Sequence, residues 1–429
     1  MLLGSSQKIT ITPPIGLRMS GFSERDHGSE GILNELYANI LVLGDGKTKA
    51  AIVTLDLIGV DKALTHRVRE VVSQNSDIPY HAVLLSASHT HSGPEACRFG
   101  DMGKISRRID PTPVDSAYNT VLPELIANGI LWANRTLQPV KLGVKQSELH
   151  GLGSNRIDDK LYMDNTVTVF RVDTVDGHPL AVLTNYTCHP TILNFNNYLY
   201  SGDFVSFYQE AIEKVYPGCV AMYAQGCAGN VSTRHNRKGQ GVDEAKRMGE
   251  LLAGHVISTL NQVDLSDDYP LYAAIEPLHL NIRQFDSDEV IEQRIKDIEA
   301  KIERLKAENA PINIQRTATV EWQGATRNFK LKQNIDIDHI DVEMQRLDIG
   351  PWTIITTPAE TFGEIGRDIR ALDPTGRTIV TGYSNGYVGY IPTAQAFREA
   401  QGYEIGVAIV EEHSEDRLIR VAKTLLHNK

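Results

Sequence analysis

The sequence predicts an α/β protein with a mixed β-sheet core flanked by helices, and three observations lead to this prediction. Short apolar segments of strand length alternate with longer segments of helical periodicity along the chain. Pro and Gly are spread through loops without marking a linker, and no internal repeat divides the sequence. At 429 residues the chain exceeds a typical domain, yet α/β proteins of this size often keep one core with insertions. We therefore expect one structural unit over residues 1–429.

The first 260 residues supply most of the expected elements. Expected strands are short apolar runs, whereas expected helices carry apolar residues three and four positions apart. Asp203 is expected to cap the helix that follows it. Strands are expected at residues 8–12, 38–43, 50–55, 82–87, 140–144, 167–172, 180–184 and 220–224, and helices at 62–73, 114–135, 203–215 and 243–260.

An insertion with helical and β elements is expected around residues 280–350. Residues 286–308 predict a one-faced helix, because apolar residues recur at helical spacing between charges. Such a helix could bind a partner or a second copy of the chain. Alternatively it packs on its own domain or forms an inserted hairpin with residues 317–322. Beyond the insertion, a strand is expected at 352–357, a helix through Gly366 and Arg370, and a strand at 379–382.

Composition excludes several classes of protein. The formal net charge of −11, without a Lys/Arg block, argues against nucleic-acid partners and binding to anionic membrane surfaces. The basic run at 234–238 is expected to be a solvated loop. No signal-peptide pattern or membrane-helix run is present, so we expect a cytoplasmic protein without stable membrane insertion. Four irregularly spaced cysteines, Cys97, Cys188, Cys219 and Cys227, predict reduced thiols, and a structural zinc site is not expected because no CxxC pair occurs.

The clearest chemical signal lies at residues 86–94, Ser-Ala-Ser-His-Thr-His-Ser-Gly-Pro. His89 and His91 end a buried strand, which places one imidazole toward a cleft and the other beside it, and Gly93 and Pro94 turn the chain away. A metal ligand and a proton carrier can share such a loop. The alternative is a chance pair, since a single histidine is more often a hydrogen-bonded core or surface residue.

A second histidine loop follows the strand expected at 180–184, where residues 185–191 read Asn-Tyr-Thr-Cys-His-Pro-Thr. Zinc takes nitrogen, oxygen and sulfur ligands, and a catalytic site draws them from separate strand ends while leaving one position for water. Cys188 is a rival donor to His189. Because neighbours on an extended segment point to opposite faces, only one of the two is expected to face a metal.

Residues that could supply oxygen ligands to a metal follow the later strands of the sequence. Glu360 comes just after the strand expected at 352–357, so it is either a third metal ligand or a first-turn glutamate stabilised by the helix dipole. Tyr383, Tyr387 and Tyr390 share a glycine-containing loop. A tyrosine oxygen can bind zinc or donate to an oxyanion, although such clusters are also ordinary loop anchors.

Residues 225–232 form a tight turn of small residues that could admit a ligand, and Ser232 presents a hydroxyl there. The lysine and spacing of a phosphate loop are missing, and so is the Gly-x-Ser-x-Gly elbow of serine hydrolases.

In this order the segments resemble the N-terminal catalytic domain of the neutral (non-lysosomal) ceramidase family. The resemblance covers nearly the whole chain, and Ser-His-Thr-His-Ser-Gly-Pro is its most specific part. Its other parts are Ile-Thr-Ile-Thr-Pro-Pro from Ile9, Met19-Ser20-Gly21-Phe22, Asn155-Arg156, His189-Pro190-Thr191, Ser201-Gly202-Asp203, Gly229-Asn230-Val231-Ser232, Glu360 with Gly366-Arg367, and Tyr387-Val388-Gly389-Tyr390-Ile391-Pro392-Thr393.

The resemblance implies a single catalytic domain that hydrolyses an amide with zinc-bound water. The implied zinc ligands are His89, His189, Glu360 and Tyr390. The implied catalytic residues are His91 as proton carrier, with Arg156, Ser232 and Tyr387 holding the substrate amide or its oxyanion. Spacing from Glu360 leaves open which of Tyr387 and Tyr390 meets the metal. Two histidines, a carboxylate and a phenolate suit zinc, although the sequence does not separate it from manganese or iron.

Departures from the family pattern bear on the substrate. The family's Gly-Asp-Val-Ser-Pro-Asn is Gly-Asn-Val-Ser-Thr-Arg at residues 229–234, and the family's C-terminal β-sandwich is not expected in this chain. A small soluble N-acyl compound is therefore as reasonable a substrate as ceramide. The alternatives are a non-catalytic metal-binding scaffold and a metal-dependent esterase or lyase acting on a sugar-derived substrate. The oligomeric state stays open.

Overall fold

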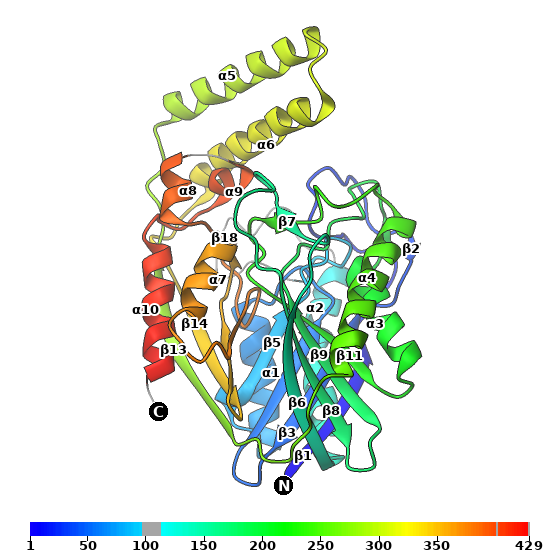
Figure 1. The fold of residues 1–429 in the computed structure, drawn as a ribbon. Coiled ribbons are helices and arrows are strands. Elements are labelled where there is room, and N and C mark those ends of the chain that lie inside the picture. The colour runs from blue at the N-terminus through cyan, green and yellow to red at the C-terminus, as the bar shows by residue number, and fades with distance from the viewer. Residues whose placement is uncertain (97–112, 400–401, 428–429) are drawn as a thin grey trace.

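The computed structural model describes residues 1–96, 113–399 and 402–427, and it contains two β-sheets with helices packed around them (Figure 1). The larger sheet has eight strands. In spatial order they are β11 (Val220–Gln225), β9 (Pro179–Tyr186), β8 (Thr166–Thr174), β6 (Gln138–Glu148), β1 (Leu2–Thr10), β3 (Tyr37–Gly44), β4 (Lys49–Leu55) and β5 (Val83–Ala87).

The larger sheet is mixed, as the sequence predicts. β4 pairs with β5 and β9 with β11 in parallel, whereas the other neighbours are antiparallel. Helices α1 (Lys62–Asn75) and α2 (Pro113–Arg135) cover the β1–β3 side, and α3 (Phe204–Val215) and α4 (Val242–Leu260) pack against β8 and β11. Buried apolar side chains fill the space between the sheet and these helices. The strands are therefore near-continuous hydrophobic runs in the sequence.

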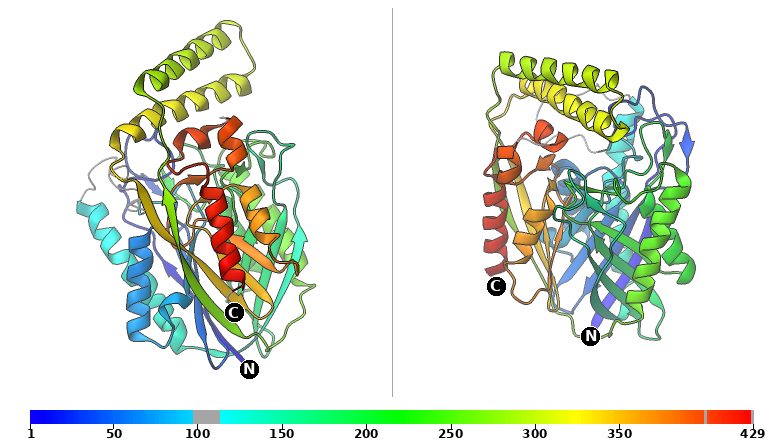
Figure 2. Two further views of the ribbon diagram at one scale, coloured as in Figure 1. Left: turned by 90° about the vertical axis from the view of Figure 1, so that its left-hand side faces the viewer. Right: turned by 45° about the horizontal axis from the view of Figure 1, so that its top comes forward.

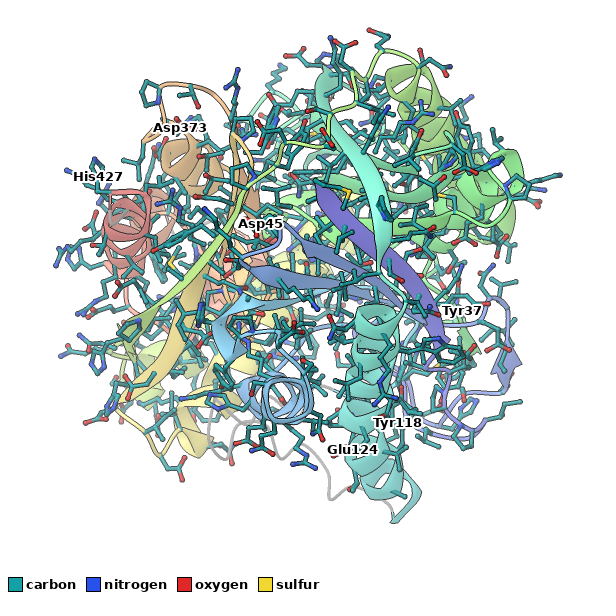
Figure 3. All side chains as sticks on the ribbon, turned by 90° about the horizontal axis from the view of Figure 1, so that it is seen from below. Tyr37, Asp45, Tyr118, Glu124, Asp373 and His427 are labelled. Carbon is teal, nitrogen blue, oxygen red and sulfur yellow. The ribbon has the colours of Figure 1, made fainter. Side chains whose placement is uncertain are left out.

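The second sheet has four strands in the order β13 (Leu271–Asn281), β14 (His339–Ile349), β15 (Trp352–Thr356) and β17 (Thr378–Thr381). Asp45, in the turn between β3 and β4, joins the two sheets because its carboxylate accepts the Leu271 N–H at 2.8 Å; Figure 3 shows Asp45 near the middle of the lower face. Helices α7 (Gly363–Arg370) and α10 (Ser414–His427) pack on this sheet and on each other. They bury a separate apolar cluster.

The edge strands β5 and β11 of the larger sheet approach each other. Residues 382–385, which extend β17, lie between their ends. Gly382 N–H bonds to Gln225 O, and Asn385 bonds to both backbone groups of Leu85. The sheet thus curls and gathers the C-terminal ends of β5, β9 and β11 in one place.

The expected insertion is a helical hairpin between β13 and β14. Helices α5 (Asp288–Ala307) and α6 (Ile312–Asn334) project from the body on the side opposite the two chain ends (Figures 1 and 2). The expected helix at 286–308 is confirmed, with Ser287 as its cap. The expectation of a β element at 317–322 is wrong, because these residues lie within α6.

Short elements complete the fold: η1 (Tyr80–Ala82), α8 (Ala394–Glu399), α9 (Tyr403–Val407), and the two-stranded pairs β2 (Gly31–Ile32) with β10 (Leu199–Tyr200), β7 (Ser154–Asn155) with β12 (Val231–Ser232), and β16 (Glu360–Thr361) with β18 (Tyr390–Ile391). Asp203 caps α3 as expected. Cys188, Cys219 and Cys227 are free and buried, in agreement with reduced thiols, while Cys97 lies outside the described residues. Among the described helices, none combines the length and apolar character needed to cross a membrane.

Candidate metal centre

His89 and His189 follow β5 and β9, so the curled sheet brings them together, with their rings 4.5 Å apart between centroids. Gln225, at the end of the neighbouring β11, ties the two loops. Its amide nitrogen donates to the carbonyl oxygens of Ser88 (3.0 Å) and Cys188 (2.7 Å), the residues that precede the two histidines. One buried side chain therefore holds together the backbones of the two histidine loops.

Both histidines are held in one tautomer by the backbone. His89 Nδ1 lies 2.6 Å from Ile58 O, and His189 Nδ1 lies 2.6 Å from Ala228 O. A carbonyl oxygen only accepts hydrogen bonds, so each Nδ1 carries the proton and each Nε2 presents a lone pair. His89 has a left-handed backbone conformation (φ 67°), an uncommon state for a non-glycine residue that often marks functional sites.

Glu360 brings a carboxylate to these lone pairs. Its Oε2 lies 3.2 Å from His89 Nε2 and 3.1 Å from His189 Nε2. Burial lowers the pKa of His189 to about 3, with Arg156 and His89 adding to the effect. Burial opposes ionisation of Glu360, but His89 and His189 hold its pKa well below the usual range. The His189 imidazole is therefore neutral near pH 7 and faces the Glu360 carboxylate.

This arrangement tests whether the residues fit a metal ion. When both imidazoles are neutral and their Nδ1 protons are committed to carbonyls, no proton lies between either Nε2 and Glu360, so lone pairs face a negative charge. Such a contact inside a buried site is repulsive without a cation, and two imidazoles with a carboxylate are common zinc ligands. The donor set therefore fits a divalent metal ion.

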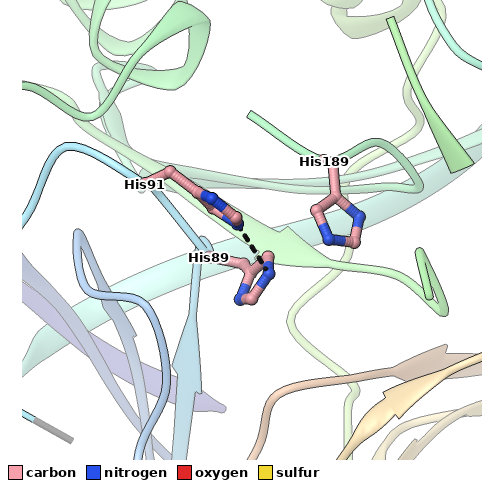
Figure 4. Close-up of side chains that lie close together, drawn as sticks. All are labelled: His89, His91 and His189. Atoms are coloured by element: carbon pink, nitrogen blue, oxygen red, sulfur yellow. Dashed lines mark hydrogen bonds between the residues drawn. The ribbon is translucent and has the colours of Figure 1, made fainter. Parts of the chain in front are cut away.

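His91 lies next to His89 in this cluster. Its Nε2 is 3.1 Å from His89 Nε2 (Figure 4), and the three histidines form a candidate metal-binding group. The His91 ring packs edge-on against Phe22 at 5.0 Å between centroids, and Gly21 lies directly beneath it. Burial lowers the pKa of His91 well below its usual value, and His89 and His189 add to this effect.

The two candidate tyrosines have different partners. The Tyr387 hydroxyl donates a short hydrogen bond to Glu360 Oε1. The Tyr390 hydroxyl instead accepts a hydrogen bond from Arg156 Nη2 at 3.0 Å. β16 and β18 pair in parallel, with Glu360 opposite Tyr390, which places both phenols beside the carboxylate-bearing strand. Tyr383 stacks on His89 with ring centroids 4.2 Å apart.

Arg156 directly follows β7 and Ser232 ends β12, so the β7–β12 pair places both residues near the cluster. Ser232 forms an isolated bridge with His189, so the serine backbone adjoins the cluster, but its hydroxyl accepts a hydrogen bond from Arg234 N–H at 3.3 Å. Asn230 holds the start of α7, since its side chain accepts from Gly363 N–H and donates to Glu364. The basic run at 234–238 is a largely exposed loop, as predicted, and Arg234 in it donates to the carbonyl oxygen of Arg156.

Comparisons with known proteins identify the family of this chain. Residues 2–248 match the family model for neutral/alkaline non-lysosomal ceramidase, N-terminal. The chain belongs to the neutral/alkaline ceramidase family. Neutral ceramidase B of Dictyostelium discoideum is 27% identical over 172 residues, 35% of this chain and 23% of that protein. Neutral ceramidase A of the same organism is 29% identical over 140 residues, 28% of this chain and 18% of that protein. The aligned part of the chain thus spans less than a quarter of either relative.

Two solved structures share the fold of this ceramidase-family chain. A ceramidase complexed with C2 aligns with a TM-score of 0.75 at 18% identity and covers 98% of this chain and 74% of that one. Neutral ceramidase from Pseudomonas aeruginosa gives a TM-score of 0.75 at 18% identity and covers 99% and 74%.

Two residues that contact the site in this family member were not predicted to do so. Glu404, on α9, lies 2.5 Å from Arg156 Nε and is almost fully buried. No local pattern around Glu404 suggests this partner, which belongs to a distant part of the sequence. Gln225 was noted as part of a tight turn, and its position at a strand end next to small residues was the available signal.

Proposed function

We propose that this chain is a metal-dependent hydrolase of amide bonds, a ceramidase-like N-acyl amidohydrolase that uses Zn²⁺. The observation that carries the proposal is the Glu360 carboxylate, flanked at 3.1 and 3.2 Å by the Nε2 lone pairs of His189 and His89. Membership of the ceramidase family supports the reaction class. Zinc is the proposed ion because imidazole and carboxylate ligands from separate strand ends suit it.

His89, His189 and Glu360 are the proposed ligands, with a tyrosine hydroxyl as the fourth donor. The resemblance favoured Tyr390 for that position and Tyr387 for the oxyanion. The hydrogen bonds support the opposite assignment, since the Tyr387 hydroxyl contacts Glu360 and the Tyr390 hydroxyl contacts Arg156. We therefore propose Tyr387 beside the ion and Tyr390 with Arg156.

A zinc ion in this site would lower the pKa of a water molecule and polarise a substrate carbonyl. The chain's own groups supply the rest of the chemistry. Arg156 and the Tyr390 hydroxyl are positioned to bind the oxygen of the scissile carbonyl and its developing negative charge. His91 Nε2, 3.1 Å from His89 Nε2, is positioned to carry a proton to the leaving nitrogen.

The proposed ligands are shielded from bulk water, which strengthens these interactions. His89, His189 and Glu360 are 1%, 0% and 4% exposed, and Tyr387 is 4% exposed. Electrostatic contacts in such a site are worth more than the same contacts in water.

Two substrate classes remain proposals. The relatives named neutral ceramidases point to ceramide. A soluble N-acyl compound, such as an N-acylated amino acid or amino sugar, is supported by Arg234, a cation held against the carbonyl of Arg156 beside the site. The cytoplasmic location and the single catalytic domain stay predictions.

The test combines elemental analysis with an amide-hydrolysis screen of tag-free protein on a short-chain ceramide and a panel of soluble N-acyl compounds. We expect about one tightly held zinc at this centre, with turnover that is lost together with the metal in His89→Ala/His189→Ala. The matched control is His150→Ala/His178→Ala, because these two histidines are exposed and lie outside the centre.

Each outcome decides part of the proposal. Turnover of soluble amides but not ceramide would keep the chemistry and fix the substrate class. Zinc binding without turnover of any amide would favour the alternative of a non-catalytic metal-binding scaffold. Full turnover by zinc-free protein would overturn the metal-dependent mechanism.

A further inference from the structure

A second cluster of metal-ligating side chains lies on the outer face of the smaller sheet, at the base of the α5–α6 hairpin. It consists of His279 on β13 with His339 and Asp341 on β14. One nitrogen of each imidazole and one carboxylate oxygen lie within 4.8 Å of one another. The cluster is separate from the metal centre described above, which is built from β5, β9 and β16.

The register of the two strands places the three side chains on one face. His279 and Asp341 are directly opposed in the antiparallel pair, and His339 precedes Asp341 by two residues on the same strand. Residues at this spacing share a face of the sheet. The imidazole rings lie 4.6 Å apart between centroids, and His279 Nδ1 is 2.7 Å from Asp341 Oδ1.

A neighbouring carboxylate orients His339. Its Nδ1 lies 2.5 Å from Asp338 Oδ1, so Nδ1–H is committed to Asp338, and Nε2 faces Asp341 Oδ2 at 3.4 Å. A carboxylate that holds the distal N–H of an imidazole is a common feature of histidine metal ligands. The three candidate donors are half-exposed side chains, which can rotate to bring their ligand atoms to the ~2.0–2.2 Å of zinc bonds.

We propose that His279, His339 and Asp341 bind a transition-metal dication of the Zn²⁺ class. Two imidazoles and one carboxylate select zinc, nickel or copper over calcium and magnesium, which prefer oxygen ligands. β13 leads into the hairpin and β14 leads out of it (Figure 2), so the bound ion joins the two strands at the base of the projecting helices.

The test is titration of metal-stripped, tag-free full-length protein with Zn²⁺, followed by calorimetry, and with Co²⁺, followed by absorption. We expect His279→Ala/His339→Ala to bind one fewer ion per chain than the wild type. His89→Ala/His189→Ala should keep that ion, because the surface cluster does not depend on the buried centre. Asp338→Ala should weaken its binding by about tenfold, because it removes the acceptor that orients His339.

The control is His150→Ala/His178→Ala, which should bind as many ions as the wild type. Equal stoichiometry and affinity in the wild type and His279→Ala/His339→Ala would overturn the surface site. Loss of the ion in His89→Ala/His189→Ala alone would confine metal binding to the buried centre, and it would likewise overturn the surface site. Failure of the buried centre to bind zinc would appear separately, as one ion in the wild type and none in His279→Ala/His339→Ala.

Discussion

Glu404 and Arg156 form a buried ion pair in which the carboxylate Oε1 lies 2.5 Å from Nε of the guanidinium. Burial opposes the charge on Arg156, but Glu404, the Tyr390 phenol and Glu360 more than offset this effect and raise the pKa of Arg156. α9, which carries Glu404, packs on α6 through the close approach of Gly406 and Gly324. The inserted hairpin thus contacts the element that holds a proposed substrate-binding cation.

Glu404→Gln is expected to lower both stability and activity. Without the Glu404 carboxylate, Arg156 loses the carboxylate that contacts it directly and keeps hydrogen bonds to Gly229 O and the Tyr390 hydroxyl. Breaking a buried pair in this way costs about 3–5 kcal/mol. Urea unfolding measures the loss, and amide hydrolysis measures the effect of a displaced guanidinium.

The double variant Arg156→Met/Glu404→Leu separates the two effects. Replacing both charges by apolar groups should restore much of the stability, since no uncompensated charge remains, while activity stays low. An equally unstable double variant would show that the loss in Glu404→Gln comes from packing and not from the unpaired cation.

Tyr387→Phe and Tyr390→Phe are expected to differ in metal retention. Tyr387 contacts the Glu360 carboxylate, so its phenylalanine variant should hold zinc about 10–100-fold more weakly. Tyr390 contacts Arg156, so Tyr390→Phe should keep its zinc and lose turnover. Competition with a chelator of known affinity gives the first value, and kcat of the zinc-loaded proteins gives the second. The reverse pattern would restore the assignment drawn from the family resemblance.

Metal removal is expected to destabilise the protein near neutral pH. With the ion gone, the Nε2 lone pairs of His89 and His189 face the Glu360 carboxylate in a buried site. In the His279→Ala/His339→Ala background, which lacks the proposed surface site, Tm should therefore fall on chelation and recover with added Zn²⁺, and adding His89→Ala/His189→Ala should abolish both changes. An unchanged Tm after chelation, with loss of the metal confirmed, would contradict this account of the buried contacts.

The strand-end histidines were predictable because local pattern governs them. An apolar strand followed by a turn fixes where His89 and His189 leave the sheet, and the structure brings them together with His91 and Glu360. Contacts between distant segments were not predictable in this way. Glu404 has a short helix around it and no motif, and only the packing of α9 on α6 places it against Arg156.

The same limit explains the errors in the insertion and the second sheet. Residues 317–322 include Thr317, Val320 and Trp322, which locally favour a strand. Contacts with α5 decide otherwise, as Trp322 Nε1 donates to Glu299 within the helical hairpin. β13 was not among the expected strands. It contains Pro277, a residue type that disfavours strands, which nevertheless pairs with Glu343 in the ladder.

Asp56 and Asp203 are each expected to contribute less stability as pH rises from about 4 to about 6, because these two buried carboxyls prefer the protonated form. Burial raises the pKa of Asp56 and of Asp203 to about 6 from the usual 3.8. Each raised pKa means that the folded chain holds a proton that the unfolded chain has already released. The stabilisation is complete below the unfolded pKa and is lost as pH rises through the folded pKa, by up to about 3 kcal/mol per group.

Asp56→Asn and Asp203→Asn should each flatten this part of the stability–pH curve, measured by urea unfolding from pH 4 to pH 7. Asparagine retains an acceptor for the Tyr37 N–H that Asp56 binds, and it is also a good helix cap in place of Asp203. A double variant with the wild-type slope would show that other groups govern the pH dependence.

Gly21→Ala is expected to displace His91 and reduce turnover while zinc stays bound. A Cβ at Gly21 would lie 2.5–2.6 Å from atoms of His91, and the backbone there has φ +99°, which alanine adopts only under strain. Gly16→Ala is the matched control, because Gly16 has φ +98° and open space where its Cβ would stand. Both variants should lose similar stability to backbone strain, and only Gly21→Ala should lose kcat, by about tenfold or more if His91 carries the proton. Equal kcat in the two variants would remove His91 from the proton-transfer step.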